Sequence, residues 1–322
     1  MLANWSSIRK APSSTCWIPT SSWATPRSPS SFRKGRILTF SPSYAGRGNL
    51  PHEISRSASP IWPRGGARLL WKKLFQEAGL MDWRGRTALV TGAGVRIGRA
   101  IALALAERGM RILVHYHTSA GPAQEVAAQI AAQGGQALAV QADLLDPSTP
   151  QRLIAQGVEA FGSVEVLVNS ASIFERGTVY DTTEEHWERH LAINLKAPFF
   201  LCQAYAKALP PGQRGHIINL ADWRALRPGT QHVAYTIAKA GLIAMTKSLA
   251  LALAPHVQVN AIAPGGILPP PGGPDEYFTR LPERLPLRRL GGPEEVVKAV
   301  LYLLDSDFVT GEVLLVTGGE HL

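Results

Sequence analysis

The stretch Thr87-Ala-Leu-Val-Thr-Gly-Ala-Gly-Val-Arg-Ile-Gly98 decides the fold of this chain. It opens with a short apolar run of the kind found in buried strands, and apolar residues at helical spacing then continue over Ile97–Arg108. Between the two segments, Gly92 and Gly94 permit a tight turn, and Gly98 lets the helix pack closely against the strand. The stretch therefore predicts a strand, a tight turn and a helix in immediate succession.

The same alternation of short β-branched runs and longer helical segments continues to the C-terminus. Strands are predicted at Thr87–Thr91, Ile112–His117, Ala137–Gln141, Val164–Asn169, His216–Leu220, Val257–Ile262 and Val313–Val316. Helices are predicted at Ile97–Arg108, Ala123–Ala132, Pro150–Phe161, Glu184–Ala208, Tyr235–Ala254 and Glu294–Leu304. This pattern indicates the α/β class: a single Rossmann-type doubly wound domain with a seven-stranded parallel sheet, covered by helices on both faces. Ligands of such sheets bind at the carboxyl ends of the strands.

The first 80 residues differ in composition from the remainder of the chain. They are rich in Ser, Pro and Arg and contain 12 Lys+Arg against 2 Asp+Glu, whereas residues 81–322 contain 21 and 22. Three interpretations stay open: a disordered tail, an organelle transit peptide, and upstream sequence translated from a start codon placed too early, since Met81 stands just before the first strand. We expect residues 1–80 to be a disordered or non-native extension. The folded domain is expected over residues 81–322, in the cytoplasm unless residues 1–80 direct it to an organelle.

Charge and cysteine content exclude several classes of function. The formal net charge of +9 resides in the first 80 residues, so the folded part is near neutral and lacks the basic patch that nucleic-acid binding needs. The two cysteines, Cys16 and Cys202, cannot build a disulfide framework or a cysteine metal site, and we expect no metal. The apolar run Gly241–Pro255 is interrupted by Lys247, so we expect no segment long enough to cross a bilayer.

The glycine-rich turn stands where a dinucleotide-binding fingerprint is required, after a strand and at the start of a helix whose N-terminus can hold a pyrophosphate. The second strand ends in His115-Tyr-His-Thr-Ser119, without the Asp or Glu that usually binds the ribose of NADH. Hydroxyls and imidazoles, with Arg96 nearby, suit the 2′-phosphate of NADPH better, while His115 and His117 are also consistent with alternating strand residues packed at an edge. Asp143, at the end of the third strand, is a candidate either to accept a bond from the adenine amino group or to cap a helix.

Tyr235 and Lys239 are the expected chemical centre. They stand four residues apart in an apolar helical segment and therefore share one helix face. An ammonium group close to a phenol stabilises the phenolate, which lowers the tyrosine pKa from about 10 towards working pH. We therefore expect Tyr235 to act as a proton donor near neutrality.

Residues 83–322 resemble the short-chain dehydrogenase/reductases and, within that family, are most similar to the pteridine reductases and the bacterial dihydromonapterin or dihydrofolate reductases. Arg96 stands where most members carry Gly, and Asp222, in Ile-Ile-Asn-Leu-Ala-Asp, stands where most carry a catalytic Ser, as in the pteridine reductases. The segment Asn169-Ser-Ala-Ser-Ile-Phe174 resembles the one that contacts the pterin in that group. The segment His115–Ser119 resembles the group's His-Tyr-His-Arg-Ser, with Thr in place of Arg.

The resemblance implies a role for individual residues. Ser172 would bond the pterin or the cofactor, and Phe174 would sandwich the pterin against the nicotinamide. The backbone of Asn194 would hold a water relay to Lys239, and Ile267–Leu290 would form the substrate lid. The implied cofactor contacts are Gly92, Gly94, Arg96, Ile97, Gly98, His117, Thr118, Ser119, Asp143, Leu144, Asn169, Ser170, Ala171, Tyr235, Lys239, Pro264, Gly265 and Ile267. The histidines expected to be surface or satisfied polar residues are His186, His190 and His232.

The implied activity is NADPH-dependent reduction of a pterin-type C=N bond in a dihydropteridine, dihydromonapterin or dihydrofolate. Tyr235 would supply the proton, Asp222 would hydrogen-bond Tyr235 and help to transmit or replenish it, and Arg96 would lie between the pyrophosphate and a pterin oxygen. Two alternatives stay open: an NADPH-dependent carbonyl reductase acting on a 3-oxoacyl thioester, sugar or other ketone, and a non-catalytic NADPH-binding regulatory module. The family commonly pairs helices that correspond to Glu184–Ala208 and Tyr235–Ala254, which implies a homotetramer or homodimer.

Overall fold

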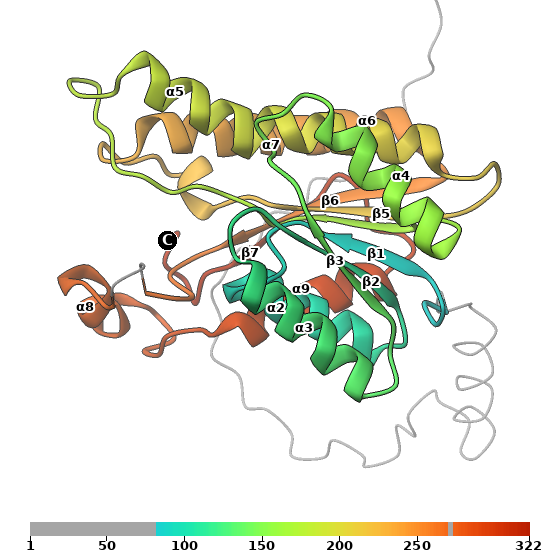
Figure 1. The fold of residues 1–322 in the computed structure, drawn as a ribbon. Coiled ribbons are helices and arrows are strands. Elements are labelled where there is room, and N and C mark those ends of the chain that lie inside the picture. Colours follow the sequence, from blue (N-terminus) through green and yellow to red (C-terminus); the bar gives the residue numbers. More distant parts are fainter. Residues whose placement is uncertain (1–81, 270–272) are drawn as a thin grey trace, which may run out of the picture. The chain divides into compact units, whose positions relative to one another are not determined.

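The computed structural model describes residues 82–269 and 273–322, so the interpretations of residues 1–80 lie outside the described residues. Its centre is a parallel sheet with the strand order β3-β2-β1-β4-β5-β6-β7 (Figure 1). The strands are β1 Thr87–Val90, β2 Arg111–Tyr116, β3 Ala137–Gln141, β4 Val166–Asn169, β5 Gly215–Leu220, β6 Val257–Pro264 and β7 Val313–Val316. The order runs outward from β1 in one direction and from β4 in the other, which confirms the predicted doubly wound domain and places the switch point between these two strands.

Helices cover both faces of the sheet, because parallel strands are apolar on both sides. In β1, Ala88 and Val90 belong to one apolar cluster and Leu89 to the other. Figure 1 shows α2, α3 and α9 against one face and α4, α6 and α7 against the other, with α5 beside α7. The bounds are α2 Arg96–Glu107, α3 Ala120–Ala132, α4 Thr149–Phe161, α5 Glu184–Leu191, α6 Ala197–Ala208, α7 Val233–Leu253 and α9 Pro293–Asp305.

The long helix predicted over Glu184–Ala208 is not a uniform α-helix. A π-helical turn, η1 Ala192–Lys196, separates α5 from α6 and contains the fully buried Asn194. Such turns insert a residue into the helical repeat and are frequent at functional sites. The prediction of a single α-helix is wrong at this point because the apolar pattern continues through the turn and gives no sign of it.

Two further elements were not predicted, α8 Glu276–Arg284 and the short 3-10 helix η2 Trp223–Ala225. Helix α8 contains Pro282 and lies in a proline-rich part of the sequence, so its helical period is hidden by residues that normally favour loops. The turn η2 begins where the side chain of Asp222 accepts a hydrogen bond from Arg224 N at 2.7 Å. Both elements lie in or beside the region expected to receive the substrate.

Helix α7 corrects the expectation about membrane segments. Within the described part of the chain, it is long and apolar enough by length and composition to cross a membrane, with a mean hydropathy of 1.4. The sequence interpretation was wrong because it counted the apolar run only from Gly241 and took Lys247 as an interruption, whereas the apolar helix extends back to Val233. The helix packs against β6 and α5, and buried helices of globular cores have the same composition.

Candidate active site

The glycine-rich turn is held between the ends of three strands. Thr91 Oγ1 accepts hydrogen bonds from the backbone N–H groups of Ser170, at 2.9 Å, and Ala171, at 3.0 Å, which ties the end of β1 to the end of β4. Beneath the turn, His115 Nδ1 accepts from Gly92 N at 3.2 Å, and its Nε2 lies 3.1 Å from Ala142 O. Burial lowers the pKa of His115 to about 4, so the ring is neutral and supports the turn from inside.

The turn meets the steric demands of a dinucleotide site. Gly92 has a φ of +66°, and a Cβ there would lie 3.0 Å from Ala171 Cα, while a Cβ on Gly98 would lie 2.3 Å from Gly92 O. Among the described residues, no side chain caps α2 at Val95 and no acidic residue occupies its first turn. The positive end of this helix therefore faces the turn without a competing carboxylate, which fits a pyrophosphate.

Arg96 occupies an unusual conformation in this turn. Its φ of +54° lies in the left-handed region, where a side chain costs energy that glycine does not. Its Nη2 donates to Pro269 O at 2.8 Å, which connects the turn to the loop that follows β6. Its position between the pyrophosphate and a pterin oxygen stays a prediction.

The ends of β2 and β3 form the rim beside the turn. His117 Nε2 lies 3.8 Å from Asp143 Oδ2, and both side chains are about half exposed. Ser119 lies so close to the turn that a Cβ on Gly94 would be 3.1 Å from its Oγ. Asp143 Oδ1 accepts from Leu145 N at 2.9 Å, whereas the N-cap of α4 is Ser148, so the helix-cap alternative for Asp143 is wrong.

The residues predicted to carry the chemistry lie together, at the end of β5 and the start of α7. Tyr235 Oη donates to Asp222 Oδ2 at 2.9 Å, and Lys239 Nζ donates to Leu220 O at 2.6 Å. Lys239 Nζ lies 5.7 Å from the centre of the Tyr235 ring, which confirms that the two side chains share a face of α7. Tyr235 is 6% exposed and Lys239 3% exposed, so both polar groups act in a nearly dry environment.

The pKa of Tyr235 moves in the direction opposite to the one predicted. Burial raises it well above its usual value, and the charge and hydrogen bond of Asp222 raise it further, against opposing effects of Arg224 and Ser172. Burial also lowers the pKa of Lys239 to about 8, with Asp222 acting against that change. The expectation that Lys239 depresses the tyrosine pKa is wrong for this structure, because burial and a carboxylate at hydrogen-bond distance outweigh it. Tyr235 is therefore a protonated phenol at neutral pH.

Asn194 organises the wall of the site through its side chain. Its Oδ1 accepts from Ser172 Oγ at 2.9 Å and from Ile173 N at 3.1 Å, and its Nδ2 donates to Ile173 O at 3.0 Å. The π-helical turn directs this amide out of the helix towards the segment that follows β4. The sequence interpretation assigned Asn194 a backbone role, whereas the structure gives its side chain a positioning role as well.

Phe174 lies beside Tyr235, and one face of its ring is covered by His232. Its ring stacks on His232 with centroids 4.0 Å apart and planes 19° apart, and it meets Tyr235 edge-on at 4.7 Å. Phe174 is 48% exposed. A flat ligand would therefore find at most one free face of this ring, and His232 would act as its backing on the other.

Arg224 was not singled out from the sequence. Its Nη1 lies 3.6 Å from Asp222 Oδ1, and its guanidinium carbon lies 5.6 Å from the centre of Phe174 and 6.0 Å from that of Tyr277 in α8. It therefore connects the carboxylate beside Tyr235 to an aromatic residue of the predicted lid. The available signal was a cation two residues after Asp222, and only the fold shows that it lies over these rings.

Glu320 is a second residue that the sequence interpretation missed. Its Oε2 accepts from Gly266 N at 2.7 Å, and its Oε1 accepts from the hydroxyl of Tyr277. A Cβ on Gly265 would lie 2.4 Å from Glu320 Oε2, so the glycine allows this close approach. The end of the chain thus anchors both the loop after β6 and α8.

Several predicted contact residues direct their side chains into the core. Asn169 Nδ2 donates to Asn219 Oδ1 at 2.8 Å, so only its backbone faces the edge of the sheet. Ile97, Leu144 and Ile267 pack against apolar clusters, and Pro264 ends β6 opposite Val316. The remaining predicted contacts lie at the turn and the strand ends and are Gly94, Gly98, Thr118, Ser170 and Ala171.

Several known proteins resemble this chain over about three quarters of its length. A family model described as enoyl-(acyl carrier protein) reductase matches residues 92–321. An L-rhamnose 1-dehydrogenase (NAD(P)(+)) from a Sphingomonas species is 37% identical over 246 residues, which cover 74% of this chain and 97% of the relative. A 3-oxoacyl-[acyl-carrier-protein] reductase from Synechocystis is 36% identical over 240 residues, which cover 73% of this chain and 96% of the relative. The solved structure of FolM alternative dihydrofolate reductase 1 from Brucella canis, complexed with NADP, is 36% identical with a TM-score of 0.71, covering 74% of this chain and 95% of that one.

Proposed function

Because the chain belongs to the short-chain dehydrogenase/reductase family and is an NAD(P)-dependent oxidoreductase, we propose that it reduces a pterin-type C=N bond with NADPH. One observation carries the proposal: Tyr235 donates its hydrogen bond to a carboxylate, Asp222, at 2.9 Å. In the resemblance described above, this carboxylate distinguishes pteridine reductases from the members that carry a serine. The similarity to FolM alternative dihydrofolate reductase 1 supports the same substrate class.

The cofactor would be held by the glycine-rich turn, the start of α2 and the rim formed by His117 and Ser119. The absence of a carboxylate at the end of β2 favours NADPH over NADH. When bound, the nicotinamide supplies the hydride. Thr118, which replaces an arginine of the pteridine reductase pattern, removes one phosphate contact and would weaken that preference.

The chain's own residues would handle the proton. Tyr235 would donate its phenolic hydrogen to the substrate nitrogen, which leaves a phenolate in a nearly dry site. Because burial and Asp222 raise the pKa of this phenol, the phenolate would readily take up another proton. Asp222, whose side chain is 14% exposed, can relay it from solvent. Lys239, placed 5.7 Å from the ring centre, would stabilise the transient negative charge.

Two residues would position the substrate. The Asn194 side chain fixes the backbone of Ile173, and so sets where Phe174 lies beside Tyr235. Arg224 would hold Asp222 on the side facing the lid. Positioning of this kind is where much of the barrier reduction in such a site would arise, because the reacting groups need near-contact geometry.

A carbonyl reductase is the second candidate, and the sequence relatives favour it. The L-rhamnose 1-dehydrogenase and the 3-oxoacyl-[acyl-carrier-protein] reductase act on hydroxyl and carbonyl groups by their names, and both cover most of the chain. Tyr235 and Lys239 suit either reaction. The carboxylate of Asp222 and the partly exposed ring of Phe174 are the features that favour the pterin reductase over the carbonyl reductase.

The experiment that tests the proposal measures NADPH oxidation by the full chain. Dihydrobiopterin, dihydrofolate and a 3-oxoacyl thioester are supplied in parallel at matched concentrations, and the reduction of NADP⁺ by L-rhamnose is measured separately, because a sugar dehydrogenase runs in that direction. The proposal expects turnover with at least one pterin and much less with the thioester or with L-rhamnose. Turnover confined to the thioester or to L-rhamnose would establish the carbonyl reductase instead, and binding of NADPH without turnover of any substrate would leave a regulatory module.

A cytoplasmic location, a folded domain over residues 81–322 and a homotetramer or homodimer belong to the same proposal. The assembly would use an apolar group of side chains on η1, α6 and α7. This group, called here the helical face, consists of Leu195, Phe199, Phe200, Met245 and Leu249.

A further inference from the structure

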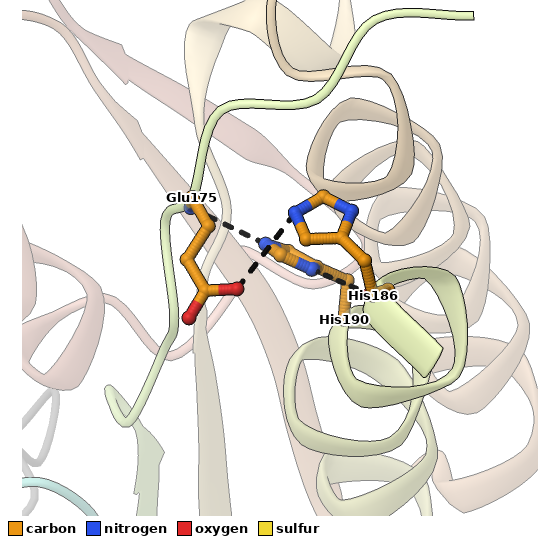
Figure 2. A group of neighbouring side chains, drawn as sticks. All are labelled: Glu175, His186 and His190. Atoms are coloured by element: carbon orange, nitrogen blue, oxygen red, sulfur yellow. Dashed lines mark hydrogen bonds and ion pairs between the residues drawn. The ribbon is translucent and has the colours of Figure 1, made fainter. Parts of the chain in front are cut away.

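Three side chains that can bind a metal ion lie close together next to Phe174, at the edge of the active site. A carboxylate oxygen of Glu175 and ring nitrogens of His186 and His190 all lie within 4.8 Å of one another (Figure 2). The two histidines stand four residues apart on α5 and so occupy one helix face. Glu175 comes from the segment that follows β4. Within the part of the chain that the structure describes, this is the group whose donors converge in this way.

His186 has no hydrogen-bond partner for either ring nitrogen among the described residues, although both atoms are buried. Its Nε2 lies 3.7 Å from Glu175 Oε2, which is too long for a hydrogen bond. Buried polar atoms of folded proteins nearly always have a partner, and an orphaned one calls for a water or an ion. The imidazole is directed towards the carboxylate and the second histidine, as Figure 2 shows.

The other two side chains are oriented as metal ligands usually are. His190 Nδ1 lies 2.8 Å from His186 O, which fixes the hydrogen on Nδ1 and leaves the lone pair of Nε2 directed at Glu175. That lone pair accepts a hydrogen bond from Glu175 N at 3.3 Å, which the ion would replace. Glu175 Oε1 is held by Arg189 Nη2 at 2.5 Å, which leaves Oε2 facing His186. Outer partners of this kind fix the orientation and tautomer of metal ligands.

We propose that Glu175, His186 and His190 bind a zinc ion. Two imidazoles and one carboxylate form a ligand set that zinc prefers, with a water molecule as the fourth ligand. Bonds of about 2.0–2.1 Å require the three donors, which lie within 4.8 Å of one another, to converge on the ion. Glu175 is 39% exposed, so solvent and the ion can reach the group.

The zinc would brace the wall of the active site. It would tie the segment after β4 to α5, directly next to Phe174, and Glu175 O already lies 2.9 Å from His232 Nδ1, whose ring backs Phe174. This departs from the expectation that the protein holds no metal. The expectation of a satisfied polar residue is confirmed for His190, whose two ring nitrogens have partners, and is wrong for His186. The sequence signal is a pair of histidines four apart, and the distant glutamate is joined to it only by the fold.

Zinc binding to the full chain tests the proposal without using catalysis. Tag-free protein is stripped with a chelator and titrated with zinc chloride in competition with a chromophoric chelator, and cobalt(II) is used in parallel as an absorbance probe. One equivalent is expected to bind, with intense tetrahedral cobalt bands. His186→Asn and Glu175→Gln are each expected to weaken zinc binding at least ~10-fold, since even the loss of an outer partner costs that much.

A control variant makes the result specific. His256→Asn removes an exposed histidine directly before β6 and should bind one zinc as tightly as the wild type. Circular dichroism and thermal unfolding establish that each variant is folded, and His190→Asn replaces any variant that is not. Absence of a bound equivalent in the wild type, or unchanged affinity in folded His186→Asn and Glu175→Gln, would overturn the proposal.

Discussion

At the scale of single residues, the site is defined by a buried phenol that keeps its proton at neutral pH until a substrate accepts it. Tyr235 Oη donates a hydrogen bond to Asp222 Oδ2 at 2.9 Å, and burial together with this carboxylate raises the pKa of Tyr235. A serine at position 222 would carry no charge to raise that pKa and no carboxylate to take up and pass on a proton. The residue that departs from the common family pattern is therefore the one that changes the proton chemistry.

Arg224 is expected to position Asp222. Replacing it by Met removes the contact at 3.6 Å from Asp222 and the guanidinium beside Phe174 and Tyr277. We predict that kcat for the preferred substrate falls about 10-fold or more through misplacement of the carboxylate, with NADPH affinity unchanged. Steady-state kinetics and cofactor titration measure both. Arg224→Lys keeps the charge and should recover part of the loss, whereas wild-type kinetics in Arg224→Met would show that the contact is incidental.

Lys239 makes stability depend on pH. Burial lowers its pKa from 10.5 in the unfolded chain to about 8 in the folded one. Below pH 8 the ammonium is charged in both states and its burial opposes folding; between pH 8 and 10.5 the folded protein loses the proton first, so its stability rises relative to Lys239→Met. The expected gain is on the order of 3 kcal/mol.

Urea unfolding of the wild type and of Lys239→Met at pH 7 and pH 10 measures this gain, because other titrating groups cancel in the difference. A difference that stays constant or falls as the pH rises contradicts the lowered pKa.

At the scale of secondary-structure elements, the π-helical turn η1 lets a residue of a helix contact the wall of the site. It inserts Asn194 at a point where the side chain can satisfy both backbone groups of Ile173. A regular α-helix through Glu184–Ala208 would direct this amide elsewhere. The same strategy of holding a loop by a buried amide appears in β6, where Asn260 binds Val309 O and Glu312 N.

Asn194→Ala and Asn260→Ala form a matched pair. Both asparagines are fully buried and bind backbone groups, so each replacement should lower the free energy of unfolding by about 2–3 kcal/mol. Only Asn194→Ala should also raise the KM for the substrate, because only Asn194 holds the segment that carries Phe174. Chemical unfolding and steady-state kinetics test the pair. Equal KM values in the two variants would show that Asn194 acts on stability alone.

The sequence predicted the regular elements well because their signals are local. Seven β-branched runs and the glycine turn are recognisable by period and composition, and every predicted strand lies within two residues of its observed bounds at either end. The interruption at η1, the helix α8 and the roles of Arg224 and Glu320 could not be predicted. Each depends on contacts between distant segments, such as Tyr277 with Glu320, that leave no periodic pattern in the sequence.

At the scale of the whole molecule, the helical face is a partly exposed apolar surface. Phe199 is 39% exposed on it, beside other apolar side chains of η1, α6 and α7. An apolar group of this kind on the surface is a candidate interface, and closed symmetric assemblies are the common outcome. The expected homotetramer or homodimer would bury this face between copies of the chain.

Phe199→Glu tests that assembly. A charge on the helical face should convert the oligomer to a monomer, as measured by light scattering after gel filtration. Leu138→Glu, on the edge strand β3 and 40% exposed, is the matched control and should leave the assembly unchanged. A wild-type protein that elutes as a monomer would contradict the assignment.

The central claim is that Asp222 gives Tyr235 a proton path suited to a pterin, and Asp222→Ser tests it most directly. The rate of NADPH oxidation is measured for the wild type and for the variant, with dihydrobiopterin and with a 3-oxoacyl thioester. We predict that turnover of the pterin falls about 100-fold, that the thioester is affected far less, and that NADPH affinity is unchanged. Equal pterin turnover in the wild type and the variant would contradict the account.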